Sequence, residues 1–312
     1  MSEAEGPLRV PKGLAGVSVA DTKIGKSASD GSLIYRGYGI SDIAANASFE
    51  ETAYLIINGR LPTRVELRGF AKGLGERARV DRRIFDIMRE LGKSAHPIDV
   101  IRTAVSALGS VDRETDMAGK EASIEAKMSV LAANSRRLPL GEGPRVSKSG
   151  LGFASDLLQM LTKQEASDFD RWVFERVLIF YMEHDMNASS FTGRVVASTL
   201  ADPYAAASAG LASLKGPLHG GANEAAMEML LQVKSPGDAK DFVDSTVKQG
   251  KKLMGFGHRV YKEFDPRARL CKQYLREMAE RRGGDGGIYG VCEAVEGEMW
   301  ERKRIPPNLD YY

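Results

Sequence analysis

The sequence has 312 residues, 43% hydrophobic and 28% charged, which suffices for a sizeable buried core and for about two domains of ordinary size. Its 44 Lys and Arg against 42 Asp and Glu leave a net charge of +2, whereas nucleic-acid binding needs a concentrated basic surface. No stretch approaches the about 18 consecutive apolar residues of a membrane span, and Met1 to Lys12 contain no apolar signal core. We therefore predict a cytoplasmic protein without a nucleic-acid or membrane partner.

The N-terminal part of the chain differs in pattern from the rest. Between Gly13 and Tyr38, β-branched and aromatic residues are interrupted by Gly and Asp, which is typical of short strands joined by turns. From Phe49 onward the apolar residues recur at helical spacing. The predicted helices cover residues 49–58, a segment opened by Pro62, and residues 80–91, 98–108, 120–138, 151–161 and 169–181. The pattern predicts an all-α protein with a small N-terminal β element.

Small side chains dominate between Ala188 and Ala212. Because small residues let helices approach closely, we expect this segment to form the tightly packed centre of the fold. The sequence contains no tandem repeat and no low-complexity block.

The histidines carry the clearest functional signal. There are four of them: His96, His184, His219 and His258. His219 and His258 stand in glycine-containing turns, where the backbone can approach a ligand closely. Arg259 and Arg267 follow His258, and arginine forks match carboxylates. These features predict a site for an anionic substrate in which neutral histidines donate hydrogen bonds, but they do not name the reaction.

Two simpler interpretations compete with this site. A single histidine is more often a hydrogen-bonded structural residue than a functional one. Alternatively, a metal-dependent hydrolase could assemble His184, His219 and His258 around a divalent ion. Zinc hydrolases usually have closely spaced histidines, whereas no two here lie within five positions of each other, so we expect no metal site. Cys271 and Cys292 are expected to be buried, reduced thiols.

Several longer motifs occur in order along nearly the whole chain, from about Gly13 to Tyr312. They are Tyr35–Tyr38, Leu61–Arg64, His96–Asp99, Glu183–Ser189, Gly216–Asn223, Gly255–Tyr261, Asp265–Arg267 and Pro307–Asp310. Together they closely resemble the motifs of the citrate synthase and 2-methylcitrate synthase family, of the archaeal and bacterial short type. The resemblance implies a two-domain helical fold, with a large domain from residue 1 to 219 and a small domain from 220 to 312. It also implies a homodimer, in which small-residue helices would pack across the two-fold axis.

The resemblance further implies three catalytic roles. His219 would stabilise the enol formed from an acyl-CoA, Asp310 would remove the α-proton, and His258 would polarise the ketone of oxaloacetate. These roles are chemically reasonable, because a thioester α-carbon is too weak an acid for a carboxylate to deprotonate unaided. A preorganised donor at the enol oxygen contributes about 3–4 kcal/mol to stabilising the transition state.

Further residues are implied to bind the substrates. His184 and Arg267, with Arg64, would hold the carboxylates of oxaloacetate. The expected contacts to CoA are Lys252, Leu253, Met254, Gly255 and Phe256, together with Lys262 and Lys303. No permanently bound cofactor is expected, since the acyl-CoA is a co-substrate. Pro306 departs from the family pattern of an aromatic or aliphatic residue and would stiffen the loop that carries Asp310.

The implied reaction is the condensation of acetyl-CoA with oxaloacetate to citrate and CoA. Two segments resemble 2-methylcitrate synthases, which use propionyl-CoA, more than citrate synthases: Gly13–Val17 and Glu298–Trp300. In contrast, Leu218 and Arg259 occur in citrate synthases. Family members of this type continue for several dozen residues beyond the position of Tyr312. A third interpretation is therefore a truncated relative, without the usual C-terminal helices of the large domain, that binds CoA or oxaloacetate without turnover.

Overall fold

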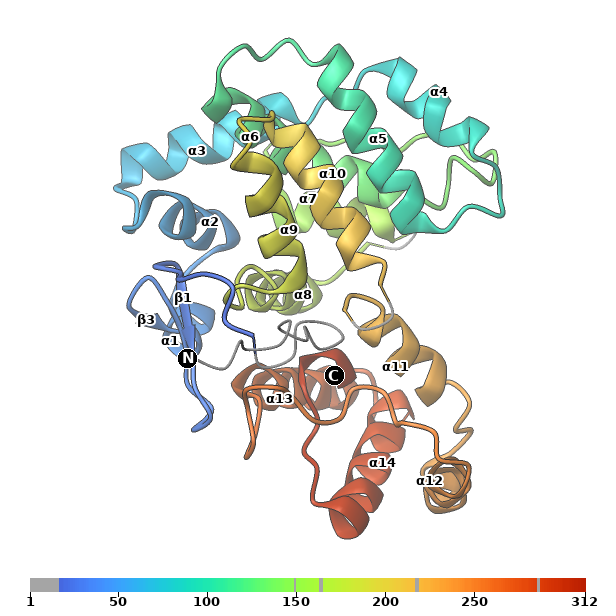
Figure 1. The fold of residues 1–312 in the computed structure, drawn as a ribbon. Helices are drawn as coiled ribbons and strands as arrows, with labels where there is room; N and C mark the ends of the chain where they lie inside the picture. The colour runs from blue at the N-terminus through green and yellow to red at the C-terminus, as the bar shows by residue number, and fades with distance from the viewer. Residues whose placement is uncertain (1–16, 149, 163–164, 217–218, 285–286) are drawn as a thin grey trace, which may run out of the picture.

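The computed structural model describes residues 17–148, 150–162, 165–216, 219–284 and 287–312. In these residues helices dominate and a single small sheet lies near the N-terminus, which confirms the predicted fold class (Figure 1). The strands are β1 Gly25–Ser27, β2 Leu33–Tyr35 and β3 Tyr38–Gly39. The α-helices are α1 Ile40–Asn46, α2 Phe49–Asn58, α3 Arg64–Arg77, α4 Arg82–Glu90, α5 Pro97–Val111, α6 Met117–Asn134, α7 Phe153–Leu161, α8 Asp168–Phe180, α9 Ala188–Ala197, α10 Pro203–Leu214, α11 Ala222–Leu230, α12 Ala239–Lys248, α13 Pro266–Arg281 and α14 Gly287–Lys303. The described residues also form two short 3₁₀ turns, η2 Pro236–Asp238 and η3 Leu309–Tyr311.

The sheet is shorter than the sequence pattern suggested. Its strands are antiparallel in the order β1-β2-β3, and Val17 and Val19 lie outside them. Tyr35 of β2 is fully buried, and its hydroxyl donates to the carbonyls of Ile179 (3.2 Å) and Phe180 (3.3 Å). The sheet is thereby attached to the C-terminal end of α8.

Helix ends follow local capping signals. The helix α2 has the predicted bounds, because Ser48 and Glu51 form a capping box at its start and Gly59 ends it with φ 77°. The helix α6 begins three residues earlier than predicted, because the Asp116 side chain accepts a hydrogen bond from the backbone N–H of Gly119. Within the described residues, none of the helices combines the length and apolar character needed to cross a bilayer.

The described residues form four apolar clusters, a small one between α2 and α7 and three larger ones that organise the helices. One joins α3 to α7 with α10, and another joins α11, α12 and α14 with Tyr311. A third lies between them and contains β2, α1 and the end of α8 together with Tyr261, Cys271 and Leu309. Figure 1 shows α11 to α14 gathered on one side of α8 and most of the other helices on its opposite side. The predicted boundary between residues 219 and 220 stays a prediction.

The small-residue segment does not form the centre of the fold, contrary to our expectation. It forms α9 and α10, which lie side by side in Figure 1. A Cβ atom added at Gly193 would lie 3.5 Å from the carbonyl oxygen of Ala206, so the two backbones are close. None of the residues of α9, all of which are described, is buried, and α10 buries only Tyr204. The small side chains therefore permit close packing of α9 on α10, and α10 also packs on α5 and α6, while α9 itself lies at the surface of the chain.

Candidate active site

Five of the predicted site residues line one cavity of about 610 Å³. They come from segments far apart in the chain. His184 follows α8, His219 precedes α11, and His258 lies between α12 and α13. Arg267 lies in the first turn of α13, and Asp310 lies in η3. The cavity thus combines three imidazoles and one guanidinium with the carboxyl groups of Asp310 and Glu183.

His258 is held as a neutral hydrogen-bond donor. Its Nδ1 accepts from the backbone N–H groups of Val260 (3.1 Å) and Tyr261 (3.3 Å). A backbone N–H can only donate, so we assign the ring proton to Nε2. Burial, together with the neighbouring His184 ring, lowers the pKa of His258 to about 4. The imidazole is therefore neutral at pH 7 and has one N–H to offer.

His184 packs against His258 and Tyr261. The two imidazole rings meet edge to face with centroids 4.9 Å apart, and Nε2 of His184 lies 3.1 Å from the Tyr261 hydroxyl. The Tyr261 ring in turn stacks on His258 at 4.6 Å. Burial is the main cause that lowers the pKa of His184, and the positive charge of Arg267 is the second. Two neutral imidazoles therefore stand side by side in the cavity wall.

Arg267 forms a buried ion pair that also fixes the loop of Asp310. Its Nε and Nη2 donate to the two carboxylate oxygens of Asp265 at 3.0 and 2.8 Å. Asp265 also caps α13 through the backbone N–H of Arg267 and accepts from the backbone N–H of Leu309 (3.1 Å). A guanidinium held in this way presents a fixed positive charge to the cavity, which suits the binding of a carboxylate.

The segment before Asp310 is cross-linked to the segment before His258. The backbone N–H of Asn308 donates to the carbonyl of Gly255 (2.8 Å), and its side-chain amide donates to the carbonyl of Gly257 (2.7 Å). The backbone N–H of Gly257 donates to the carbonyl of Pro306 (2.9 Å). Asn308 also accepts from the backbone N–H of Asp310 (2.9 Å). Two loops distant in sequence are thereby joined, and they place Asp310 and His258 on the same cavity.

Tyr181 contacts the proposed base directly. Its hydroxyl donates to Oδ1 of Asp310 at 2.9 Å. Burial is the main cause that raises the pKa of Tyr181, and the nearby Asp310 carboxylate is the second. The hydroxyl therefore keeps its proton and remains a donor. No pattern in the sequence indicated a functional role for this residue, since an aromatic residue at the end of an amphipathic helix usually packs against a neighbour.

His219 is held by Ser189, the second residue of α9. Its Nε2 lies 3.3 Å from the backbone nitrogen and 2.7 Å from the hydroxyl of Ser189. Because the backbone N–H can only donate, we assign Nε2 as the acceptor and the ring proton to Nδ1. The same hydroxyl lies 2.8 Å from the carbonyl of Gly210 in α10, and its single proton serves one acceptor at a time. Burial, followed by the charge of Arg259, lowers the pKa of His219, so this ring is also neutral at pH 7.

The remaining predicted residues lie elsewhere. Arg64 is exposed at the start of α3 and is not among the described residues that line this cavity. Lys252, Lys262 and Lys303 are exposed, and Lys262 donates to the carbonyl of Arg259 (3.0 Å). In the predicted CoA segment, Leu253 and Gly255 are buried, and Met254 and Phe256 are partly exposed. The expected CoA contacts therefore stay a prediction.

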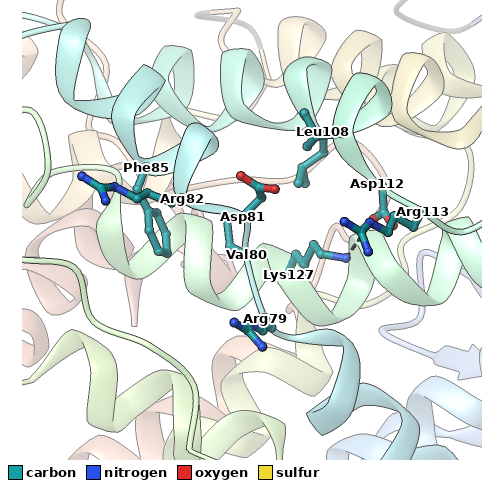
Figure 2. A pocket seen from close by; sticks show the side chains of 10 residues that line it. Arg79, Val80, Asp81, Arg82, Phe85, Leu108, Asp112, Arg113 and Lys127 are labelled. Carbon is teal, nitrogen blue, oxygen red and sulfur yellow. Dashed lines mark hydrogen bonds and ion pairs between the residues drawn. The ribbon is translucent and has the colours of Figure 1, made fainter.

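A second cavity, of about 670 Å³, lies between α4, α5 and α6 (Figure 2). In its wall the carboxylate of Asp112 accepts from Lys127 (2.8 Å) and from the Tyr204 hydroxyl (2.5 Å). Its described lining contains no histidine, and its buried carboxylate already has its partners. Among the residues that the structure describes, no group of three or more His, Cys, Asp and Glu side chains could hold a metal ion. The histidine cavity is therefore our candidate active site.

Comparison with known proteins agrees with this geometry. A family model described as citrate synthase, C-terminal domain, matches residues 13–312. The chain is 37% identical to citrate synthase 2 of Bacillus subtilis, covering 98% of this chain and 83% of that protein. It is 39% identical to 2-methylcitrate synthase of Mycobacterium tuberculosis, covering 97% of this chain and 78% of that protein.

Solved structures show the same fold. The citrate synthase of the archaeon Thermoplasma acidophilum, in a ternary complex with carboxymethyl-coenzyme A and oxaloacetate, has a TM-score of 0.88 and 30% identity. The alignment covers 96% of this chain and 82% of that one. The citrate synthase of Pyrobaculum aerophilum has a TM-score of 0.85 and 33% identity over 95% of this chain and 79% of that one. The chain therefore belongs to the citrate synthase family and is an acyltransferase of the citrate synthase type.

Proposed function

We propose that this chain condenses acetyl-CoA with oxaloacetate to give citrate and CoA. The observation that carries the proposal is that His219, His258 and Asp310 line one cavity, with both imidazoles neutral at pH 7. A neutral imidazole donates a hydrogen bond to a carbonyl oxygen without protonating a nearby carboxylate base. The combination of one base and two such donors suits carbon–carbon bond formation between a thioester and a ketone.

The first step is removal of the α-proton. The Asp310 carboxylate takes a proton from the α-carbon of the thioester, and His219 donates its N–H to the carbonyl oxygen that becomes the enol oxygen. One preorganised donor of this kind contributes about 3–4 kcal/mol. The Tyr181 hydroxyl donates to Oδ1 of this carboxylate in the structure.

The second step forms the carbon–carbon bond. The enol carbon attacks the ketone carbon of oxaloacetate, and the ketone oxygen gains negative charge. The Nε2–H of His258 donates to that oxygen and transfers its proton, so the product carries a hydroxyl group. The proton that Asp310 took from the α-carbon restores the His258 ring through water, so both residues return to their starting states. Water then hydrolyses the thioester, which releases citrate and free CoA thiol.

Arg267 and His184 are proposed to hold the oxaloacetate carboxylates. Arg267 has a fixed orientation because Asp265 binds two of its nitrogens, and His184 lies beside His258. The relative from Thermoplasma acidophilum, which was solved with oxaloacetate and a CoA analogue, supports these two substrate classes. Binding of CoA by Lys252 to Phe256, Lys262 and Lys303, a contribution of Arg64, and a homodimer remain part of the proposal.

The test is release of free CoA thiol when the protein is mixed with acetyl-CoA and oxaloacetate. We expect turnover that needs both substrates and is unaffected by a metal chelator. In Asp310→Asn, kcat is expected to fall by about 10²–10⁴, because the base is lost. The folded structure should persist in that variant, because an asparagine oxygen still accepts from Tyr181. Ligand-induced thermal stabilisation without CoA release would identify a non-catalytic binding protein instead, and loss of activity on chelation would indicate a metal-dependent hydrolase.

A further inference from the structure

The first strand of the N-terminal sheet lies against the segment that carries His184. This segment, residues 181–187, joins α8 to α9 and contains no helix or strand. In β1 the first and third positions, Gly25 and Ser27, face the same side of the sheet, because side-chain directions alternate along a strand. The middle residue, Lys26, is exposed. A sheet of such short strands depends on its contacts with the rest of the chain.

Both positions on that face of β1 contact a chain neighbour of His184. The Ser27 hydroxyl donates to Oδ2 of Asp185. A Cβ atom added at Gly25 would lie 2.7 Å from Oε1 of Glu183 and 2.8 Å from its Cγ, so a glycine is needed to leave room for this side chain. The strand therefore contacts the residue before His184 and the residue after it.

The backbone turns at Asp185. Its φ of 55° lies in the left-handed region, which most side chains avoid but aspartate and asparagine tolerate. Its carbonyl accepts from the backbone N–H of Asn187 (3.1 Å), the residue that caps α9. Because Ser27 binds the side chain of Asp185, β1 fixes the residue at which the chain turns. The direction in which His184 leaves the backbone depends on that turn.

Two further contacts hold the ends of the segment. Tyr35 of β2 donates to the carbonyls of Ile179 and Phe180, at the end of α8. Beyond the segment, Nη1 of Arg194 in α9 donates to the carbonyl of Asp21, shortly before β1 (3.0 Å). The N-terminal region thus holds the segment at both ends as well as in the middle.

The ring of His184 has a defined place in the cavity wall. Its Nε2 lies 3.1 Å from the Tyr261 hydroxyl, and its ring meets that of His258 edge to face. A shift of the segment would move this ring relative to His258. A misplacement of about 1 Å can lower activity by about a hundredfold, even when its cause lies far from the reacting atoms.

We propose that β1 positions His184 for binding of oxaloacetate, and that it acts through Ser27 and Gly25. Neither residue is among the described residues that line the cavity, so both act through the loop and not by touching a substrate. The inference rests on the proposed function and deepens it. It adds the N-terminal sheet to the parts of the chain that determine the affinity for oxaloacetate.

The test measures Kd for oxaloacetate by calorimetry and KM for oxaloacetate by CoA release. In Ser27→Ala the Asp185 carboxylate loses its donor, so both constants should rise about threefold or more. The value of kcat at saturating substrate should change much less, because the loss concerns binding. Lys26→Ala is the matched control, since it removes an exposed side chain from the same strand and should change none of these constants.

Gly25→Ala tests the second contact. The added Cβ displaces the Glu183 side chain, so we expect Kd and KM for oxaloacetate to rise about tenfold or more. If this variant does not fold, Ser27→Ala still decides the question.

Two variants of Asp185 separate positioning from folding. Asp185→Asn keeps an acceptor for Ser27 and a residue type that tolerates the left-handed backbone, so its affinity for oxaloacetate should stay close to that of the wild type. Asp185→Ala loses both properties and should bind at least as weakly as Ser27→Ala. A lower melting temperature with unchanged affinity would indicate a purely structural role for β1 and overturn the inference.

The same measurements distinguish the inference from the proposed function. Equal affinities in Ser27→Ala and Lys26→Ala would overturn the inference and leave the condensation standing. A wild type that binds oxaloacetate but releases no CoA would overturn the condensation alone. A wild type that neither binds oxaloacetate nor releases CoA would overturn both.

Discussion

The two halves of the candidate active site are held in different ways. Around His258 and Asp310, two loops are joined by several backbone and side-chain hydrogen bonds, and the buried pair of Asp265 and Arg267 lies beneath them. His219 depends instead on Ser189, which belongs to a helix without buried residues. We infer that changes in the first half affect stability and activity together. Changes in the second half should affect mainly activity.

The largest expected effect comes from breaking the buried pair. Asp265→Asn leaves Arg267 charged and buried without its counter-ion, which should lower the free energy of unfolding by about 3–5 kcal/mol. Urea denaturation measures this change. Asp81→Asn is the control, because its partner Arg83 is exposed and asparagine still caps α4. That control should leave the stability nearly unchanged. Equal losses in the two variants would remove the distinction between the two halves.

Replacement of a glycine in the half around His258 and Asp310 should lower the stability nearly as much. Gly255 has φ 81°, and an added Cβ would lie 2.8 Å from the Cβ of Tyr311. Gly250 has a similar φ of 66° with nothing within 4 Å of the added atom. Both alanine variants incur the left-handed backbone penalty of about 1–2 kcal/mol. Gly255→Ala should be destabilised by about a further 1–3 kcal/mol through the clash, as measured by thermal or urea unfolding. Equal values would show that the loop can move aside.

The half around His219 should respond in activity alone. Ser189→Ala removes the hydroxyl next to the ring and leaves the backbone N–H in place. A neutral hydrogen bond is worth about 0.5–1.5 kcal/mol, so we expect kcat to fall by about tenfold at most, with little change in the melting temperature. Ser198→Ala, at the exposed end of α9, should change neither quantity. A large loss of stability in Ser189→Ala would show that this half is also structurally coupled.

The smallest expected effect is on the pH profile. His184, His219 and His258 all have lowered pKa values, to about 4 for His258. A lowered pKa keeps an imidazole neutral as the pH falls, since protonation begins only near the pKa. We therefore expect kcat/KM to change little as the pH falls through the ordinary histidine range, and its acid-side half-maximum to lie below that range. A half-maximum near the ordinary histidine value of about 6.5 would contradict the burial of these rings.

Prediction of the fold from sequence succeeded where the signals were local. The bounds of α2 follow from Ser48, Glu51 and Gly59, which lie within one helix and its ends. The prediction that the small-residue segment forms the centre of the fold failed for α9. The composition of a helix shows how closely another helix can approach, but it does not show whether the helix is buried. The extent of the sheet was also overestimated, since isolated β-branched residues such as Val17 and Val19 had no pairing partner.

Prediction of the site was uneven for a similar reason. His184, His219, His258, Arg267 and Asp310 lie in recognisable motifs, and the structure brings them to one cavity. The contact of Tyr181 with Asp310 spans 129 positions and leaves no pattern in the chain. The position of Arg64 outside the cavity was equally hidden, because its motif describes only the start of α3.

The sequence by itself determined which helices can form, where glycines permit tight turns, and which acid, base and cation are available. These properties depend on a few neighbouring residues. Only the tertiary structure decided which ring nitrogen carries the proton, which histidines stay neutral at pH 7, and which strand contacts the residues on either side of His184. Those properties depend on burial and on contacts through space, which segments far apart in the chain create only when they pack together.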